Sequence, residues 1–90
     1  MVKIGENVFM VAANLSMEEL SERLDLKLEE KDFETVGGFI YDLVGSLPDV
    51  GQKIDVDGIR FVVEKIRGQR IEKVKIILTE VGDEGPPGGD

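Results

Sequence analysis

The hydrophobic pattern of this chain changes its period near Pro48. In the segment 35–45 before this proline, apolar residues recur at helical spacing, whereas after it they alternate with polar residues, as they do in strands that bury one face. The clearest helical pattern places apolar side chains on one face of a helix at Val36, Phe39, Ile40, Leu43 and Val44. Helices followed by a run of antiparallel strands are typical of an α+β domain.

One strand and one helix are expected before this central helix. The apolar run 7–13 predicts a buried strand. Ser16 and Glu19 match a capping box, in which each side chain bonds a backbone N–H of the other residue, and they predict a helix over Met17 to Leu24. The residues after that helix predict a short extended segment and then a charged loop: Leu24, Leu26 and Leu28, followed by 29–34.

The second helix begins after Thr35, a favourable N-cap, and ends at Gly45. Three antiparallel strands are expected after it, joined by an Asp-Gly turn and by the turn 67–70. Their ranges are Lys53 to Val56, Ile59 to Ile66 and Ile71 to Leu78, with Ile59, Phe61, Val63, Val74, Ile76 and Leu78 facing the core. The predicted fold is therefore two short helices packed on one face of a mainly antiparallel sheet, in the order β-α-α-β-β-β.

A chain of 90 residues has room for one small domain. We expect residues 1–6 to be an N-terminal boundary segment and residues 7–78 to be the folded domain. Residues 79–90 are rich in glycine, proline and acidic side chains, so they predict a mobile tail.

The composition excludes several classes of function. The chain contains no histidine and no cysteine, so it lacks the commonest general base, the commonest zinc ligand and the thiol nucleophile, and we expect no enzyme. A net charge of −8 argues against nucleic-acid binding. Because no apolar run approaches about 20 residues, we expect no direct insertion into a bilayer.

Charge is spread unevenly along the chain. The segment 16–34 is strongly acidic, whereas the segment 53–75 contains seven lysines and arginines against four acids. Two interpretations remain open at this point. The charges belong either to solvated faces of different elements or to opposed patches that dock a partner.

Paired glycines open the second helix. Gly37 and Gly38 each cost about 1 kcal/mol of helix stability relative to alanine, so they need a reason. Either the backbone packs closely against another element, or it approaches a ligand. In the second case Thr35, Gly37 and Gly38 are the candidate binding residues, because a helix N-terminus attracts phosphate. Neither GxGxxG nor a P-loop motif is present.

The segment 53–64 resembles a calcium loop in part, since Asp55, Asp57, Gly58 and Glu64 fall at its positions 3, 5, 6 and 12. Lys53, however, occupies the first ligand position, where an ammonium group cannot bind a cation. The alternating flanks favour a β-hairpin with Asp57 and Gly58 at its turn.

Taken together, several motifs between Val8 and Leu78 resemble the transporter-associated (CorC/HlyC) domain. They are MEELSERLDL, TVGGFIYDLVGSLPDVGQKI, the DG turn and IRFVVEKIRGQRIEKVKIIL. That family is found at the C-terminus of CBS-domain membrane proteins linked to magnesium and cobalt efflux, some of them called haemolysins. Its fold is similar to part of the FAD-binding fold of the vanillyl-alcohol-oxidase type.

The resemblance implies an excised regulatory domain of an ion transporter, located at the cytoplasmic face of the membrane. Its expected partners are the neighbouring CBS and membrane domains of the parent protein, or a second copy in a homodimer. The expected mechanism is contact rather than catalysis, with no resident cofactor or metal. The alternative is a sensor module in which Thr35, Gly37 and Gly38 bind the phosphate of FAD or an adenine nucleotide.

Overall fold

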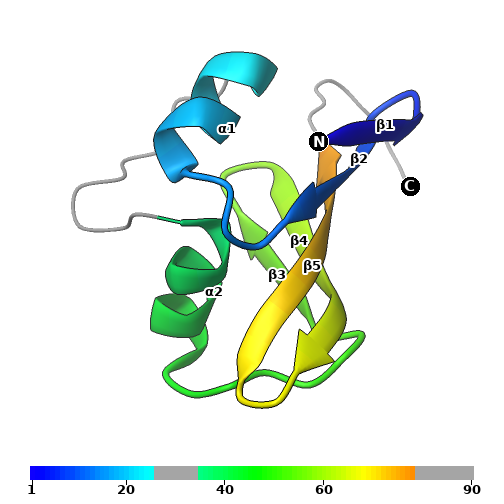
Figure 1. Cartoon of the computed structure of the whole chain (residues 1–90). Helices are drawn as coiled ribbons and strands as arrows, with labels where there is room; N and C mark the ends of the chain where they lie inside the picture. The colour runs from blue at the N-terminus through cyan, green and yellow to red at the C-terminus, as the bar shows by residue number, and fades with distance from the viewer. Residues whose placement is uncertain (26–34, 79–90) are drawn as a thin grey trace, which may run out of the picture.

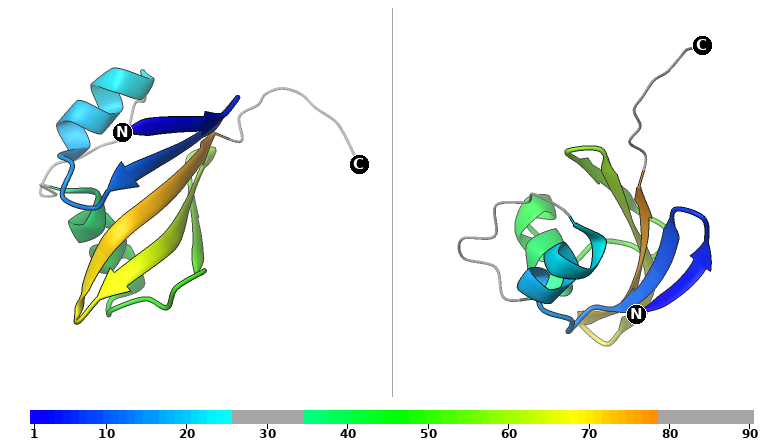
Figure 2. Two further views of the ribbon diagram at one scale, coloured as in Figure 1. Left: turned by 45° about the vertical axis from the view of Figure 1, so that its right-hand side comes forward. Right: turned by 90° about the horizontal axis from the view of Figure 1, so that it is seen from above.

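The computed structural model describes residues 1–25 and 35–78, which form a five-stranded antiparallel sheet with two helices on one of its faces (Figures 1 and 2). In chain order the elements are β1 (Val2–Gly5), β2 (Val8–Ala12), α1 (Met17–Leu24), α2 (Val36–Val44), β3 (Lys53–Val56), β4 (Ile59–Arg67) and β5 (Arg70–Leu78). The predicted α+β class and the order from β2 onward are confirmed. The predicted extended segment and loop over 26–34 and the predicted tail over 79–90 lie outside the described residues.

The strands lie side by side in the order β1-β2-β5-β4-β3. The β3-β4-β5 meander is joined to the β1-β2 hairpin along β5, with Val8 opposite Ile77 and Ala12 opposite Lys73. The last strand of the described residues, β5, is therefore the middle strand of the sheet. The antiparallel pairing of β2 with β5 joins segments that are more than 60 residues apart in the sequence.

Strand β1 is a feature that the sequence does not predict, since residues 1–6 were expected to precede the domain. Val2 lies opposite Met10 and Lys3 opposite Phe9, so this segment extends the sheet by one edge strand. The strand is short and exposed, with Val2 at 61% exposure, and therefore carries no burial pattern that would mark it in the sequence.

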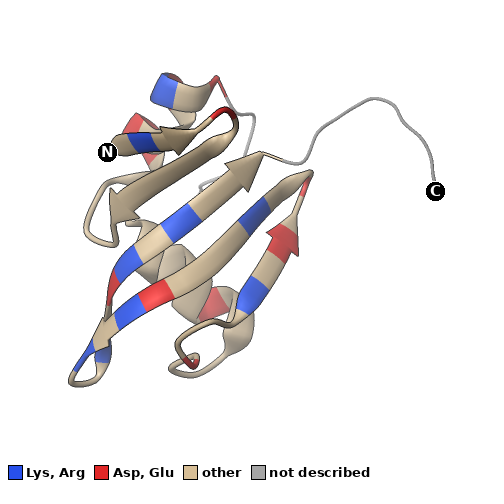
Figure 3. Cartoon of the chain, turned by 90° about the vertical axis from the view of Figure 1, so that its right-hand side faces the viewer, with Lys and Arg blue, Asp and Glu red and all other residues tan. Residues whose placement is uncertain are grey.

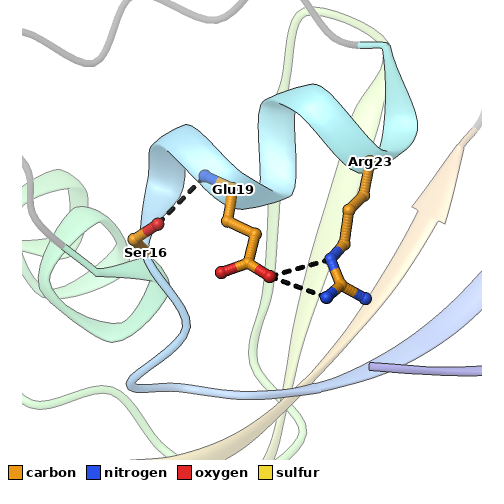
Figure 4. A network of polar contacts seen from close by, with 3 residues as sticks. All are labelled: Ser16, Glu19 and Arg23. Atoms are coloured by element: carbon orange, nitrogen blue, oxygen red, sulfur yellow. Dashed lines mark hydrogen bonds and ion pairs between the residues drawn. The ribbon is translucent and has the colours of Figure 1, made fainter.

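Local capping fixes both helices. The hydroxyl of Ser16 accepts a hydrogen bond of 2.9 Å from the backbone N–H of Glu19, which confirms the serine half of the capping box (Figure 4). The Glu19 carboxylate instead points to Arg23, one turn along α1, and the two form an ion pair of 2.7 Å. Helix α2 has Thr35 as its N-cap and ends at Gly45, whose positive φ of 87° suits glycine.

The core lies between the helices and the sheet. Phe61 on β4 is fully buried, and its ring centroid is 5.4 Å from that of Phe39 on α2 at an angle of 56°, a favourable tilted arrangement. The predicted core faces of β4 and β5 are confirmed. The predicted stripe on α2 is buried at Val36, Phe39 and Ile40, whereas Leu43 in its last turn is 45% exposed.

We expect Phe61→Ala to lower the free energy of unfolding by about 3–5 kcal/mol, because it removes a buried ring and leaves a cavity between the sheet and α2. Urea unfolding followed by circular dichroism measures this loss. Tyr41→Ala is the matched control, since this aromatic side chain is about half exposed and should change stability by less than about 0.5 kcal/mol. Equal losses in the two variants would contradict the assigned core.

Candidate functional site

The start of α2 lies against the turn that follows β2. The backbone N–H of Gly37 donates to the carbonyl of Ala13 at 2.9 Å, and that of Val36 donates to the carbonyl of Leu15 at 2.9 Å. A Cβ atom at position 37 would lie 3.1 Å from the Ala13 Cβ and 3.3 Å from its carbonyl oxygen. Gly37 is therefore needed for a close approach of two backbone segments, which supports the packing interpretation at this position.

Gly38 is exposed and has a different environment. Its N–H donates to the Thr35 hydroxyl at 3.0 Å, and the first helical bond runs from the N–H of Phe39 to the carbonyl of Thr35 at 2.9 Å. Each N–H at the start of α2 is thus already bonded within the chain. A phosphate at this helix end would have to displace one of these bonds, so phosphate binding by Thr35, Gly37 and Gly38 stays a prediction.

The structure does bring the three predicted binding residues together on one surface. They line an open hollow of about 250 Å³, together with Ala13, Asn14, Tyr41, Gln69, Arg70 and Ile71. A second hollow of about 360 Å³ adjoins it and is lined by Ala12, Asn14, Arg67, Arg70, Ile71, Glu72 and Lys73. Asn14 and Arg70 face both hollows, and neither residue was predicted to belong to a site. Their only sequence signals were a turn and a basic segment.

The calcium-loop residues lie in the hairpin formed by β3 and β4. The Asp55 carboxylate accepts hydrogen bonds from Arg60 at 2.7 and 3.2 Å, and this bonding holds the pKa of the Asp55 carboxyl below its ordinary value. Asp57 and Gly58 both have positive φ, 50° and 79°, in the turn between β3 and β4. The hairpin interpretation is confirmed. Within residues 1–25 and 35–78, no group of three or more acidic side chains is arranged to hold a metal ion.

Residues 2–80 match the CorC_HlyC family, which is described as the transporter associated domain. The chain belongs to this family. It is 27% identical to the magnesium and cobalt efflux protein CorC of Escherichia coli K12 over 84 residues, which cover 93% of this chain and 28% of that protein. The corresponding protein of Salmonella typhimurium is 25% identical over 78 residues, or 87% of this chain and 27% of that protein. The domain thus spans less than a third of these relatives.

Solved structures of transporter-associated domains share the fold. A domain from a Xylella fastidiosa haemolysin, solved in complex with Mg²⁺ and Mn²⁺, is 28% identical and superposes with a TM-score of 0.80 over 89% of this chain and 98% of that one. A conserved domain from Neisseria meningitidis is 41% identical, with a TM-score of 0.71 over 79% of this chain and 96% of that one. The further likeness to an FAD-binding fold stays a prediction.

None of the helices within the described ranges has the length and apolar character required to cross a bilayer. The longest of them, α2, has nine residues.

We expect Gly37→Ala to destabilise the domain by about 1–3 kcal/mol, because the new methyl group would meet the Cβ and carbonyl oxygen of Ala13. Gly38→Ala is the matched control. Its methyl group would meet only the Thr35 hydroxyl, a side-chain atom, at 3.2 Å, and alanine favours the helix by up to about 1 kcal/mol. Thermal and urea unfolding of both variants should place Gly37→Ala below Gly38→Ala. The reverse order would show that packing does not select glycine at position 37.

Proposed function

We propose that this chain acts as a non-catalytic accessory domain of a CBS-domain-containing ion transporter of the magnesium and cobalt type. It would lie at the cytoplasmic face of the membrane and regulate transport through contacts with the neighbouring CBS and membrane domains, or with a second copy. The observation that carries this proposal is the match over 93% of this chain to only 28% of an efflux protein. A conserved part of a larger protein suits an accessory role.

The core and surface of the domain support a role in binding neighbouring domains. Its apolar residues fill the space between helices and sheet, and the two hollows beside the β4-β5 turn open to the surface. The chain has no histidine or cysteine to act as a base or nucleophile. Regulation by contact requires that the domain bind its neighbours with different affinity in two states of the transporter.

A chimera tests this proposal. The region of E. coli CorC that matches this chain is deleted, and in a second strain it is replaced by this chain; cobalt efflux from loaded cells is measured. We expect the deletion to reduce efflux or abolish its regulation and the replacement to restore it in part. A replacement that carries Phe61→Ala should restore less, because its fold is weakened. Unchanged efflux and regulation after the deletion would refute the accessory role.

The nucleotide alternative has one observation in its favour, which is that Thr35, Gly37 and Gly38 line a common hollow with Arg70. That hollow, at about 250 Å³, is below the roughly 300–1,000 Å³ of most small-molecule sites. Isothermal calorimetry with FAD and with ATP tests this alternative on the purified chain. Saturable heat that Arg70→Ala removes would support it, whereas no heat at high micromolar ligand would eliminate it.

A further inference from the structure

The two hollows adjoin each other at the turn end of the β4-β5 hairpin, and we call them together the hairpin-end groove. They meet at Asn14, Arg70 and Ile71. One wall is the turn after β2 together with the start of α2, and the other is the end of the β4-β5 hairpin. Figure 3 shows Lys and Arg gathered at this hairpin end, on a chain whose net charge is −8.

The positive charge of the groove is concentrated on three side chains. Arg67, Arg70 and Lys73 all line its larger hollow. Arg67 lies 3.6 Å from Oε1 of Glu72, which also lines this hollow; the arginine is exposed, whereas this carboxylate oxygen is buried and accepts no hydrogen bond from the described residues. Arg70 and Lys73 form no ion pair with any residue in the described part of the chain. Two cations are thus available for a partner in an otherwise acidic protein.

The strand register at this hairpin end is unfavourable for the isolated domain. Arg67 lies directly opposite Arg70, and Lys65 lies opposite Lys73 where the register shifts on both sides of Lys65, so two cross-strand pairs near the turn carry like charges. Like charges in directly opposed positions destabilise a sheet. Elsewhere on the same sheet Arg60 pairs with Asp55 and Lys75 with Glu64. The stability of the isolated domain therefore does not explain why lysine and arginine are concentrated at this hairpin end.

The remaining lining of the groove suits an extended chain. Asn14, Thr35 and Gln69 offer polar side chains for peptide groups. Gly37 and Gly38 also line this hollow, and Gly38 is exposed at the surface. We propose that the hairpin-end groove binds an acidic, extended peptide segment of a neighbouring domain in the parent protein. This inference rests on the proposed accessory function and specifies the chemistry of its partner.

A peptide fits these observations better than a small anion does. The N–H groups at the start of α2 are engaged within the chain, so they cannot hold a phosphate without losing those bonds. The cations are distributed along the groove from Arg67 to Lys73. Because an exposed ion pair contributes little by itself, a ligand with several spaced carboxylates gains more from this arrangement than a single anion.

The test uses the purified ¹⁵N-labelled chain at low salt and hexaglutamate as the probe. We expect amide shifts to concentrate at residues 12–14, 35–38 and 67–73 during titration. Arg70→Glu/Lys73→Glu should weaken binding about tenfold or more, because two attractive contacts become repulsive. Binding should also weaken as salt rises. Lys3→Glu/Lys53→Glu is the matched control, with the same change in net charge on the two edge strands, and should lower affinity much less.

Four results would overturn the proposal. The first is amide shifts that are dispersed, with no maximum at the groove, and the second is an equal loss of binding in the two double variants. The third is inorganic pyrophosphate binding at the same residues as tightly as hexaglutamate. The fourth is self-association in ultracentrifugation that Arg70→Glu/Lys73→Glu abolishes. The last result would assign the groove to a second copy.

Cobalt efflux by the chimera is a separate readout. Normal rescue of efflux without peptide binding would refute only the proposed binding in the groove. Peptide binding without rescue would support the groove and refute the accessory role.

Discussion

The backbone of Ala13 joins the two layers of this domain. Its N–H donates to the carbonyl of Glu72 on β5 at 2.9 Å, and its carbonyl accepts from the N–H of Gly37 on α2 at 2.9 Å. One peptide segment therefore connects the middle strand of the sheet to the first turn of the helix. The absence of a side chain at Gly37 permits this contact, and the position of α2 over the core depends on it.

Local signals predicted the elements well. The caps at Ser16 and Thr35, the apolar stripe of α2 and the Asp57-Gly58 turn each act within a few residues, so the sequence contains the whole interaction. Strand β1 and the placement of β2 beside β5 were not predicted, because they depend on partners far away in the chain. Leu43 was predicted to be buried and is exposed instead, since the helical pattern alone does not show how much of α2 the sheet covers.

The candidate site was predicted only in part, because its residues come from segments that are far apart in the sequence. Thr35, Gly37 and Gly38 were recognisable from their order, and they do share one surface. Asn14 and Arg70 join them only because β2 pairs with β5 and carries its following turn to the turn end of the β4-β5 hairpin. The like-charged pairs at Lys65 and Lys73 likewise exist only in the folded register. Charge counted along the sequence suggested a basic segment but could not show that its cations line a groove.

The groove and the contact between the layers share two residues. Ala13 and Gly37 line the smaller hollow and also hold α2 against the turn after β2. A segment bound in the groove would touch both the helix and the β4-β5 hairpin, so its affinity would depend on their relative position. By linkage, a neighbour that shifts this position changes binding, and binding in turn favours one position. A domain with a filled core can transmit a signal by this route, because only the free energy of its contacts has to change.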